Sequence, residues 1–425
     1  MLRIDVEPAQ ALIDHEITTG ISGLEPGQKV KLRAFMRDNQ DRSWESQATF
    51  QANPTGSVDL SVDKPIQGTY DDVDSMGMFW SMVKKTEGTN PGVVRGNELK
   101  PMVMHFTAAS DGSENASASL ERIFCAPGVK RTEVRERGLV GTFFEPPGRG
   151  GVPGIVVVGG SVGGLTEARA ALLASHGFTA LALAYFGVAG LPKYLSEIPL
   201  EYFDTALQWL NSQESVIDGK LGVMGQSRGG ELALLLGATF SSVRAVVAFV
   251  PSGIVHGGFP DDGPAWAYRD APIPYISLDP TPFSNAPVGD RDAVTLTPVF
   301  LRELLIEALT QPDLTASTGI PVERTNGPIL FISGEDDQMW PSFVLSEISV
   351  ARLKAHHHPY SFEHLSYEGA GHGINIPYLP TTETSIKHPV DGRVYDLGGC
   401  PVKNAVANAD SWKRMLRFFE TALKQ

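Results

Sequence analysis

The sequence contains little cysteine: Cys125 and Cys400 are the two cysteines in a chain of 425 residues. Two cysteines so far apart provide neither a disulfide framework nor the spacing of a zinc site. An apolar run long enough to span a membrane is also missing, and the start, MLRIDVEP, lacks the apolar core of a signal peptide. These absences predict a cytoplasmic protein with no membrane span and no bound metal.

Basic residues are also fewer than acidic ones: the chain has 35 Lys and Arg and 49 Asp and Glu, which gives a net charge of −14. A nucleic-acid-binding domain would carry a basic stripe. The nearest match is the short cluster at residues 130–137, which we interpret as a solvated face near a domain junction. Nucleic acid is therefore not an expected partner. The length exceeds that of one ordinary core and predicts two or three domains.

Residues 1–140 have the pattern of a β domain. Leu2, Ile4 and Val6 alternate with polar residues, and residues 29–36 alternate in the same way. Turn-forming pairs rich in Pro, Gly, Asn and Asp separate these runs. We therefore predict an all-β, immunoglobulin-like sandwich domain over residues 1–140.

The pattern changes after the Pro- and Gly-rich segment 146–153, which is typical of a linker or a hairpin turn. Apolar runs of strand length then alternate with segments of helical spacing. The expected strands are residues 154–159, 178–185 and 221–224, and the expected helices are residues 167–176, 198–210 and 231–240. This alternation predicts a second, α/β domain over residues 141–425, with a doubly wound and mostly parallel sheet.

Residues 225–229 read Gly-Gln-Ser-Arg-Gly, which fits the motif G-x-S-x-G. The motif follows an expected strand and precedes an expected helix, as in the nucleophile elbow of α/β hydrolases. We predict Ser227 as the nucleophile and the backbone N–H of Arg228 as one donor of the oxyanion hole. The structural alternative is a Gly-rich turn in which Ser227 caps the helix.

A catalytic serine needs a base and an acid that orients the base, and in this fold they follow in the order acid, then histidine. Asp336 and Asp337 both follow the expected strand 328–333, and we favour Asp337 as the acid. His372 lies between two glycines, which let a loop present the imidazole. The competing histidines are His364, within an expected strand, and His388.

A second oxyanion donor should come from the loop after an early strand. Residues 159–164, Gly-Gly-Ser-Val-Gly-Gly, are that loop, and we assign the donor to Ser161. The loop has no G-x-x-x-x-G-K-[ST] or G-x-G-x-x-G pattern, so a nucleotide cofactor is not expected. The triplet at residues 356–358, three histidines, is interpreted as a solvated helix end rather than a metal site.

Ordered matches across nearly the whole chain resemble one family, the type I acyl-CoA thioesterases together with bile acid-CoA:amino acid N-acyltransferase. The matching stretches are residues 23–28, 32–34, 76–80, 163–165, 180–185, 191–193, 200–203, 225–232, 320–324, 334–337, 371–372 and 377–378 with Trp340. The resemblance implies a β-sandwich followed by an α/β-hydrolase domain, with the triad on Ser227, Asp337 and His372. The family splits by nucleophile, and Ser227 resembles the hydrolytic branch rather than the cysteine-bearing acyltransferase.

We therefore expect hydrolysis of acyl-CoA or a related acyl thioester through a serine acyl-enzyme, without a cofactor. The alternatives are transfer of the acyl group to an amine or alcohol, an esterase or peptidase acting on substrates without CoA, and a non-catalytic binding protein on the same scaffold. Residues 253–317 match the family poorly and are rich in Pro and Asp. We expect a lid-like insertion there, with an amphipathic helix at residues 300–306.

Overall fold

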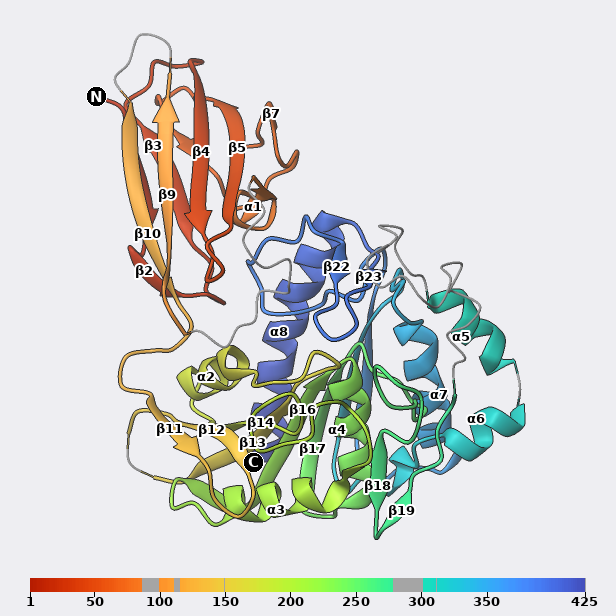
Figure 1. Ribbon diagram of the computed structural model, residues 1–425. Helices are drawn as coiled ribbons and strands as arrows, with labels where there is room; N and C mark the ends of the chain where they lie inside the picture. The colour runs from red at the N-terminus through yellow and green to blue at the C-terminus, as the bar shows by residue number, and fades with distance from the viewer. Residues whose placement is uncertain (86–98, 111–114, 149, 278–300, 311, 425) are drawn as a thin grey trace.

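The computed structural model of the protein describes residues 1–85, 99–110, 115–148, 150–277, 301–310 and 312–424. Two β-sheets form the N-terminal part, drawn in red and orange in Figure 1. The larger sheet has the strand order β2 (Gln10–Leu12), β10 (Ala116–Ile123), β9 (Met102–Ala109), β4 (Lys29–Arg37), β5 (Ser43–Gln51) and β7 (Gln67–Gly68), and β8 (Val83–Lys84) also pairs with β5. The smaller sheet has the order β1 (Arg3–Glu7), β3 (Thr18–Ser22) and β6 (Val58–Asp59).

Buried and exposed residues alternate along these strands, so that one face of each sheet contributes to a shared core. In β4 the burial alternates strictly, with Val30, Leu32, Ala34 and Met36 turned inward. The same apolar cluster contains Ile4 and Ile21 of the smaller sheet, so the two sheets pack face to face. The short helix α1 (Gly77–Trp80) is buried against this core.

The second part is built on an 8-stranded mixed sheet. Its order is β11 (Lys130–Val134), β12 (Val140–Glu145), β14 (Thr179–Ala184), β13 (Val152–Val158), β16 (Val216–Gln226), β17 (Val243–Phe249), β20 (Ile329–Gly334) and β21 (Phe362–Tyr367). Strand β12 is antiparallel to both neighbours, while the strands from β14 to β21 run parallel. The Pro- and Gly-rich segment 146–153 connects β12 to β13 inside this sheet, so it does not join two domains.

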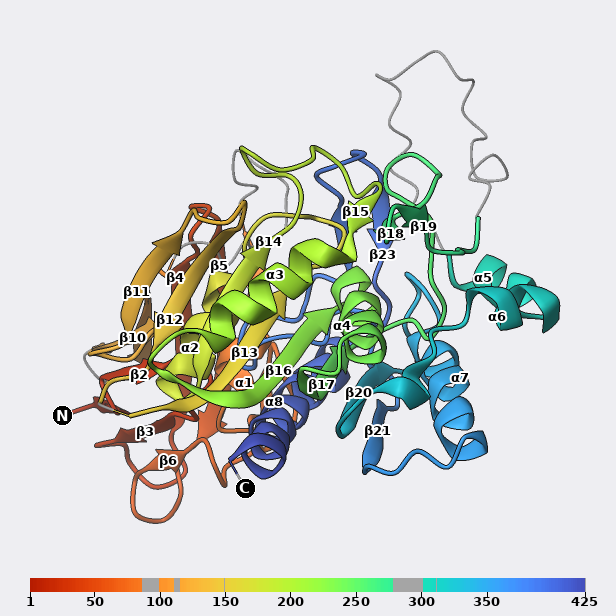
Figure 2. The same ribbon diagram turned by 90° about the horizontal axis from the view of Figure 1, so that it is seen from below.

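Helices cover both faces of this sheet, as Figure 2 shows. One apolar core contains residues of α3 (Leu200–Asn211), α4 (Arg228–Thr239) and α7 (Ser342–Ala355), and the other contains residues of α2 (Glu167–Ser175) and α8 (Pro401–Leu423). Successive strand residues such as Val156 and Val157 fall in different cores, because side chains alternate across a strand. Residues 198–199, expected as the start of a helix, instead form the short strand β15 (Ile198–Pro199).

The segment 253–317 contains β18 (Trp266–Tyr268), β19 (Ala271–Pro272), α5 (Arg302–Leu309) and most of α6 (Pro312–Thr318), and residues 278–300 lie outside the described part. The expected helix at 300–306 corresponds to α5, apart from Phe300, which is not described. The remaining short elements are η2 (Val322–Arg324), β22 (Ser385–Lys387) and β23 (Val394–Asp396). No helix within the described ranges has the length and apolar character needed to cross a membrane.

Helix α8 joins the two parts of the molecule (Figure 1). Its early residue Ala405 belongs to the core between the two N-terminal sheets, whereas Phe419 belongs to a core of the 8-stranded sheet. Trp412 donates its indole N–H to Asp14 at 2.8 Å across the junction. The two β-sheet regions are therefore linked by shared apolar packing and by buried hydrogen bonds.

Candidate active site

Ser227 lies in the turn between β16 and α4, at the carboxyl edge of the 8-stranded sheet. Its backbone has φ 57° and ψ −122°, a strained conformation for a residue with a side chain. The side chain makes no helix-capping hydrogen bond, so the capping alternative does not describe it. Instead, its Oγ lies 2.9 Å from Nε2 of His372.

Glycines are needed on both sides of this turn for steric reasons. A Cβ on Gly225 would lie 1.9 Å from the backbone oxygen of Gly229, and a Cβ on Gly229 would lie 2.3 Å from that of Gly159. The two glycines of G-x-S-x-G therefore allow β16, α4 and the 159–164 loop to approach closely. That approach brings the 159–164 loop beside Ser227, since a Cβ on Gly160 would lie 3.4 Å from the Cβ of Ser227.

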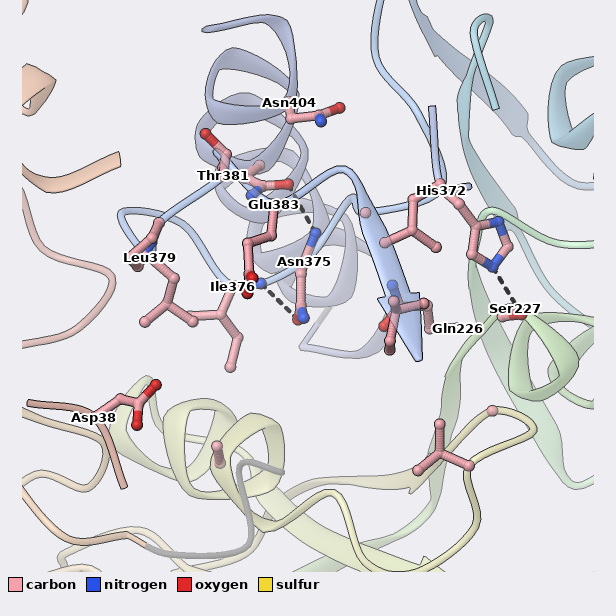
Figure 3. Close-up of a pocket in the computed structure, with 18 of the residues that line it drawn as sticks. Asp38, Gln226, Ser227, His372, Asn375, Ile376, Leu379, Thr381, Glu383 and Asn404 are labelled. Carbon is pink, nitrogen blue, oxygen red and sulfur yellow. Dashed lines mark hydrogen bonds between the residues drawn. The ribbon is translucent and has the colours of Figure 1, made fainter. Parts of the chain in front are cut away.

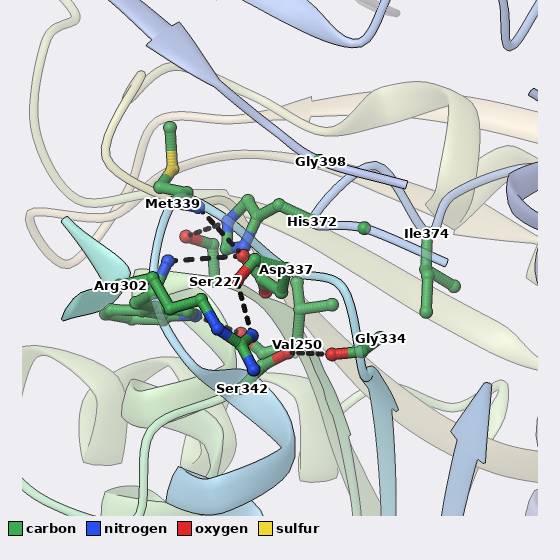
Figure 4. A network of polar contacts seen from close by, with 12 residues as sticks. Ser227, Val250, Arg302, Gly334, Asp337, Met339, Ser342, His372, Ile374 and Gly398 are labelled. Atoms are coloured by element: carbon green, nitrogen blue, oxygen red, sulfur yellow. Dashed lines mark hydrogen bonds and ion pairs between the residues drawn. The ribbon is translucent and has the colours of Figure 1, made fainter. Parts of the chain in front are cut away.

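His372 connects Ser227 to Asp337 (Figure 4). Its Nδ1 lies 2.7 Å from Oδ2 of Asp337, and both side chains are buried. Since the carboxylate is an acceptor, Nδ1 carries the proton and Nε2 is free to accept from the serine hydroxyl. The other carboxylate oxygen of Asp337 accepts from the backbone N–H groups of Met339 and Trp340, each at 3.1 Å, which fixes its orientation.

The two competing histidines and the second aspartate occupy other positions. Asp336 accepts hydrogen bonds from Gln338 and from the backbone of Gly399, away from His372. His364, on β21, bridges Ser333 and Glu347 at 2.7 and 2.6 Å. His388 lies 3.0 Å from the hydroxyl of Ser161. Of the two candidate aspartates and three candidate histidines, Asp337 and His372 are the ones that the structure connects to Ser227.

An aromatic side chain, Trp340, packs against the imidazole of His372. Trp340 packs edge-on to His372 with ring centroids 5.8 Å apart, and on its other side it faces His256 at 4.9 Å. Burial lowers the pKa of His256, although Glu231 at 3.0 Å acts in the opposite direction. The rings of His256 and His372 thus both pack against Trp340, which restricts the position of the His372 imidazole.

One expected oxyanion donor directly follows Ser227 in the chain, and the other lies in the 159–164 loop that packs beside Ser227. Arg228 turns its side chain away, donating to the backbone oxygens of His256 and Gly257 at 3.0 and 2.8 Å. Its backbone N–H belongs to the first turn of α4, where N–H groups have no partner within the helix. Ser161 lies in the adjacent loop, and its side chain contacts His388 rather than Ser227.

Ser227 and His372 open onto a cavity of about 520 Å³ (Figure 3). Its walls come from both β-sheet regions: Asp38 stands at the end opposite Ser227, and Leu379 and Ile376 line the middle. The lining has more apolar than polar surface, which suits an acyl chain. The cavity is therefore completed by the N-terminal part of the chain.

Several lining residues were not singled out from the sequence. Arg169 of α2 and Asn375, three residues after His372, are hydrogen-bonded to each other at 2.7 Å, and Arg169 also donates to Gln226. Arg169 could have been noticed in the sequence, because it is an arginine in the otherwise Ala- and Leu-rich helix 167–175. No sequence pattern pointed to Asn375 as a lining residue.

A possible metal-binding group lies elsewhere. Within the described residues, Asp14, His15 and His176 bring potential ligand atoms within 4.8 Å of one another. None of the three lines the cavity. Oδ2 of Asp14 already accepts from His176 at 2.6 Å and from Trp412, so two of these groups take part in contacts between the two parts of the chain.

The sheet order and the strand–turn–helix that carries Ser227 define the α/β-hydrolase class. Residues 198–425 match the family described as BAAT / Acyl-CoA thioester hydrolase C terminal, and residues 14–136 match Acyl-CoA thioester hydrolase/BAAT N-terminal region. The chain belongs to this acyl-CoA thioester hydrolase/BAAT family, which confirms the resemblance seen in the sequence.

Two mouse relatives show the extent of the similarity. Acyl-coenzyme A amino acid N-acyltransferase 1 is 33% identical over 100% of this chain and 99% of its own. Acyl-coenzyme A thioesterase 1 is also 33% identical, over 99% of this chain and 96% of its own. Among solved structures, a dienelactone hydrolase-like promiscuous phosphotriesterase from metagenomic libraries aligns with a TM-score of 0.42 at 20% identity, covering 69% of this chain and 99% of that one.

Proposed function

We propose that the protein hydrolyses acyl-CoA or a related acyl thioester through an acyl-enzyme on Ser227. The observation that carries this proposal is the hydrogen-bonded series Ser227, His372 and Asp337, with contacts of 2.9 and 2.7 Å. Membership of a family whose relatives are named acyl-CoA thioesterases supports the choice of substrate. The cavity beside the serine, whose lining has more apolar than polar surface, supports an acyl chain as the bound group.

In this mechanism Ser227 Oγ attacks the thioester carbonyl while His372 Nε2 accepts its proton. Asp337 holds the imidazole and stabilises its protonated form. The N–H groups of Arg228 and Ser161 receive the developing oxyanion. His372 then returns the proton to the departing thiolate, and water attacks the acyl-enzyme by the reverse sequence, so that the acid is released and Ser227 is regenerated.

Acyl transfer to an amine is the second candidate, because the chain is as similar to a named amino acid N-acyltransferase as to a named thioesterase. In that reaction an amine nitrogen forms the C–N bond as the bond to Ser227 Oγ breaks, and His372 relays the amine proton to Oγ. Serine at the elbow favours hydrolysis as the main outcome, as the sequence already indicated.

We also propose two domains, an immunoglobulin-like sandwich and an α/β-hydrolase domain that contains the insertion 253–317. The expected division was at residue 140. Because β11 (Lys130–Val134) already pairs with β12 of the 8-stranded sheet, we place the division between residues 123 and 130.

The test is release of free thiol from a series of acyl-CoAs by the wild type and by Ser227→Ala, with the acyl product identified by mass spectrometry. We expect free acid as the main product and a loss of turnover in the variant of about 10⁶-fold. An amide in the presence of amino acids would favour transfer instead. A wild type that releases no thiol from any acyl-CoA would refute the assignment.

A further inference from the structure

Among the described residues, four arginine side chains are almost completely buried: Arg42, Arg122, Arg169 and Arg228. Removing a guanidinium from water is unfavourable unless a negative charge offsets the lost hydration. Arg42 has Asp38 at 2.7 Å and Arg228 has Glu231 at 3.4 Å. Arg122 lies in the field of Asp14 and donates to backbone oxygens at the domain junction. Three of the four therefore have a carboxylate nearby.

Arg169 differs from these three. Only burial acts on its pKa, lowering it to about 10, and no carboxylate in the described part of the chain counteracts that effect. Its side-chain partners are the neutral amide oxygens of Gln226 and Asn375. The structure thus keeps a guanidinium, 6% exposed, without an opposite charge.

The unpaired donors of Arg169 are accessible from the active-site cavity. Both of its hydrogen bonds leave from Nη2. Its Nε and Nη1 make no hydrogen bond to the described residues and are not fully buried, unlike Nε of Arg228, and Arg169 is part of the cavity wall. Gln226, which accepts from Arg169, directly precedes Ser227. Arg169, Gln226 and Ser227 all line this cavity.

We propose that Arg169 forms a carboxylate-binding subsite of the active-site cavity, which takes a substrate group that carries a carboxylate. This inference rests on the proposed acyl-thioester chemistry and names a substrate class for it. A guanidinium whose Nε and Nη1 carry no hydrogen bond can donate to a carboxylate from either atom, and a charge-assisted hydrogen bond of this kind is stronger than one between neutral groups. The carboxylate belongs either to the far end of a short acyl chain or to an amino acid that accepts the acyl group.

Matched substrate pairs separate these two sources. Glutaryl-CoA and pentanoyl-CoA differ in a terminal carboxylate, and glycine and glycinamide differ in the same way as acceptors. We expect Arg169→Met to lower kcat/KM for the charged member of at least one pair by about 100-fold more than for its neutral counterpart. Arg169→Lys, which keeps the charge but places a single ammonium in place of the planar guanidinium, should lower kcat/KM for the charged member by about tenfold.

Asn375→Ala is the matched control, because it removes the same hydrogen bond from Arg169 without removing the charge. We expect it to slow both members of a pair by the same factor. If Arg169→Met also slows both members equally in both pairs, Arg169 only positions Gln226 and Asn375, and the subsite is refuted.

A binding measurement keeps this test independent of turnover. Calorimetry with the full chain should show glutarate binding to the wild type and to Asn375→Ala but not to Arg169→Met, with neutral glutaramide as the reference. If the wild type hydrolyses no acyl-CoA, the proposed function fails while glutarate binding still supports the subsite. A wild type that binds glutarate no better than glutaramide overturns the subsite.

Discussion

Arg302 donates from Nη1 to the backbone oxygen of Asp337 at 2.8 Å (Figure 4). Arg302 is the first residue of α5, in the segment 253–317 that we expected to form a lid-like insertion. The contact ties that segment to the loop that carries Asp337. The segment therefore supports the position of Asp337, while none of its described residues lines the cavity.

We predict that Arg302→Ala lowers kcat by about tenfold, because one hydrogen bond from a charged donor contributes about 1.5 kcal/mol. The protein should remain folded, since the side chain is only partly buried. The measurement is steady-state thiol release with one acyl-CoA, beside Glu307→Ala, an exposed charge on the same helix. Equal activity in both variants would show that the contact does not orient Asp337.

The two adjacent aspartates should respond differently to the same substitution. Asp337→Asn leaves a neutral partner for His372 and is expected to lower kcat by about 10⁴-fold, because the imidazole loses its correct tautomer. Asp336→Asn keeps one of the two acceptor oxygens that bind Gln338 and Gly399 and should keep activity within about threefold of the wild type. Comparing the two under identical assay conditions decides the identity of the acid, and a larger loss in Asp336→Asn would reverse the assignment.

The close packing at the elbow predicts a steric effect. In Gly229→Ala the added Cβ meets the backbone oxygen of Gly159 at 2.3 Å, so the 159–164 loop or α4 must shift. We expect activity to fall by at least about 100-fold, because displacements of about 1 Å near reacting groups have effects of this size. Gly20→Ala is the control, since its Cβ would lie 3.5 Å from the oxygen of Val58, an ordinary contact. Circular dichroism would confirm that both variants are folded.

Asp14 at the domain junction predicts a pH-dependent contribution to stability. Burial raises the pKa of Asp14, but the hydrogen bonds and charge of His176 and the hydrogen bond from Trp412 outweigh it, so the folded pKa lies below the ordinary 3.8. A lowered folded pKa means that the stabilisation is present above the unfolded pKa and is lost as the pH falls through the folded one.

We therefore expect Asp14→Asn to lower the free energy of unfolding by about 2 kcal/mol near neutral pH. The difference from the wild type should shrink when urea unfolding is repeated below about pH 3.8. Asp72→Asn, at an exposed side chain, serves as the control and should change stability by less than about 0.5 kcal/mol. A difference between Asp14→Asn and the wild type that does not vary with pH would contradict this reasoning.

Local patterns predicted the strands and helices around Ser227 well. The buried run at residues 178–185 and the helical spacing at 167–176 correspond to β14 and α2 within one or two residues. Such elements are readable because alternation and helical spacing act over a few neighbouring residues. The order of the eight strands was not read from the sequence, since it depends on pairings between distant segments.

Long-range contacts limited the prediction of the site itself. Asp336 and Asp337 are equivalent in the sequence, and their roles separate only because His372 approaches one of them from 35 residues away. Arg169 and Asn375 are 206 residues apart, so their contact had no local signal. The sequence thus pointed to Ser227 through a motif, whereas the residues that surround it in the cavity required the fold.

The position of α8 has a consequence for the order of assembly during synthesis. Ribosomes make the chain from its N-terminus, so the two N-terminal sheets emerge long before Ala405 and Tyr378, which belong to their core. Phe419 and Trp412 of the same helix complete a core of the 8-stranded sheet. Both parts of the chain therefore expose apolar surface until α8 has been synthesised. We expect nascent chains that stop before α8 to depend on chaperones.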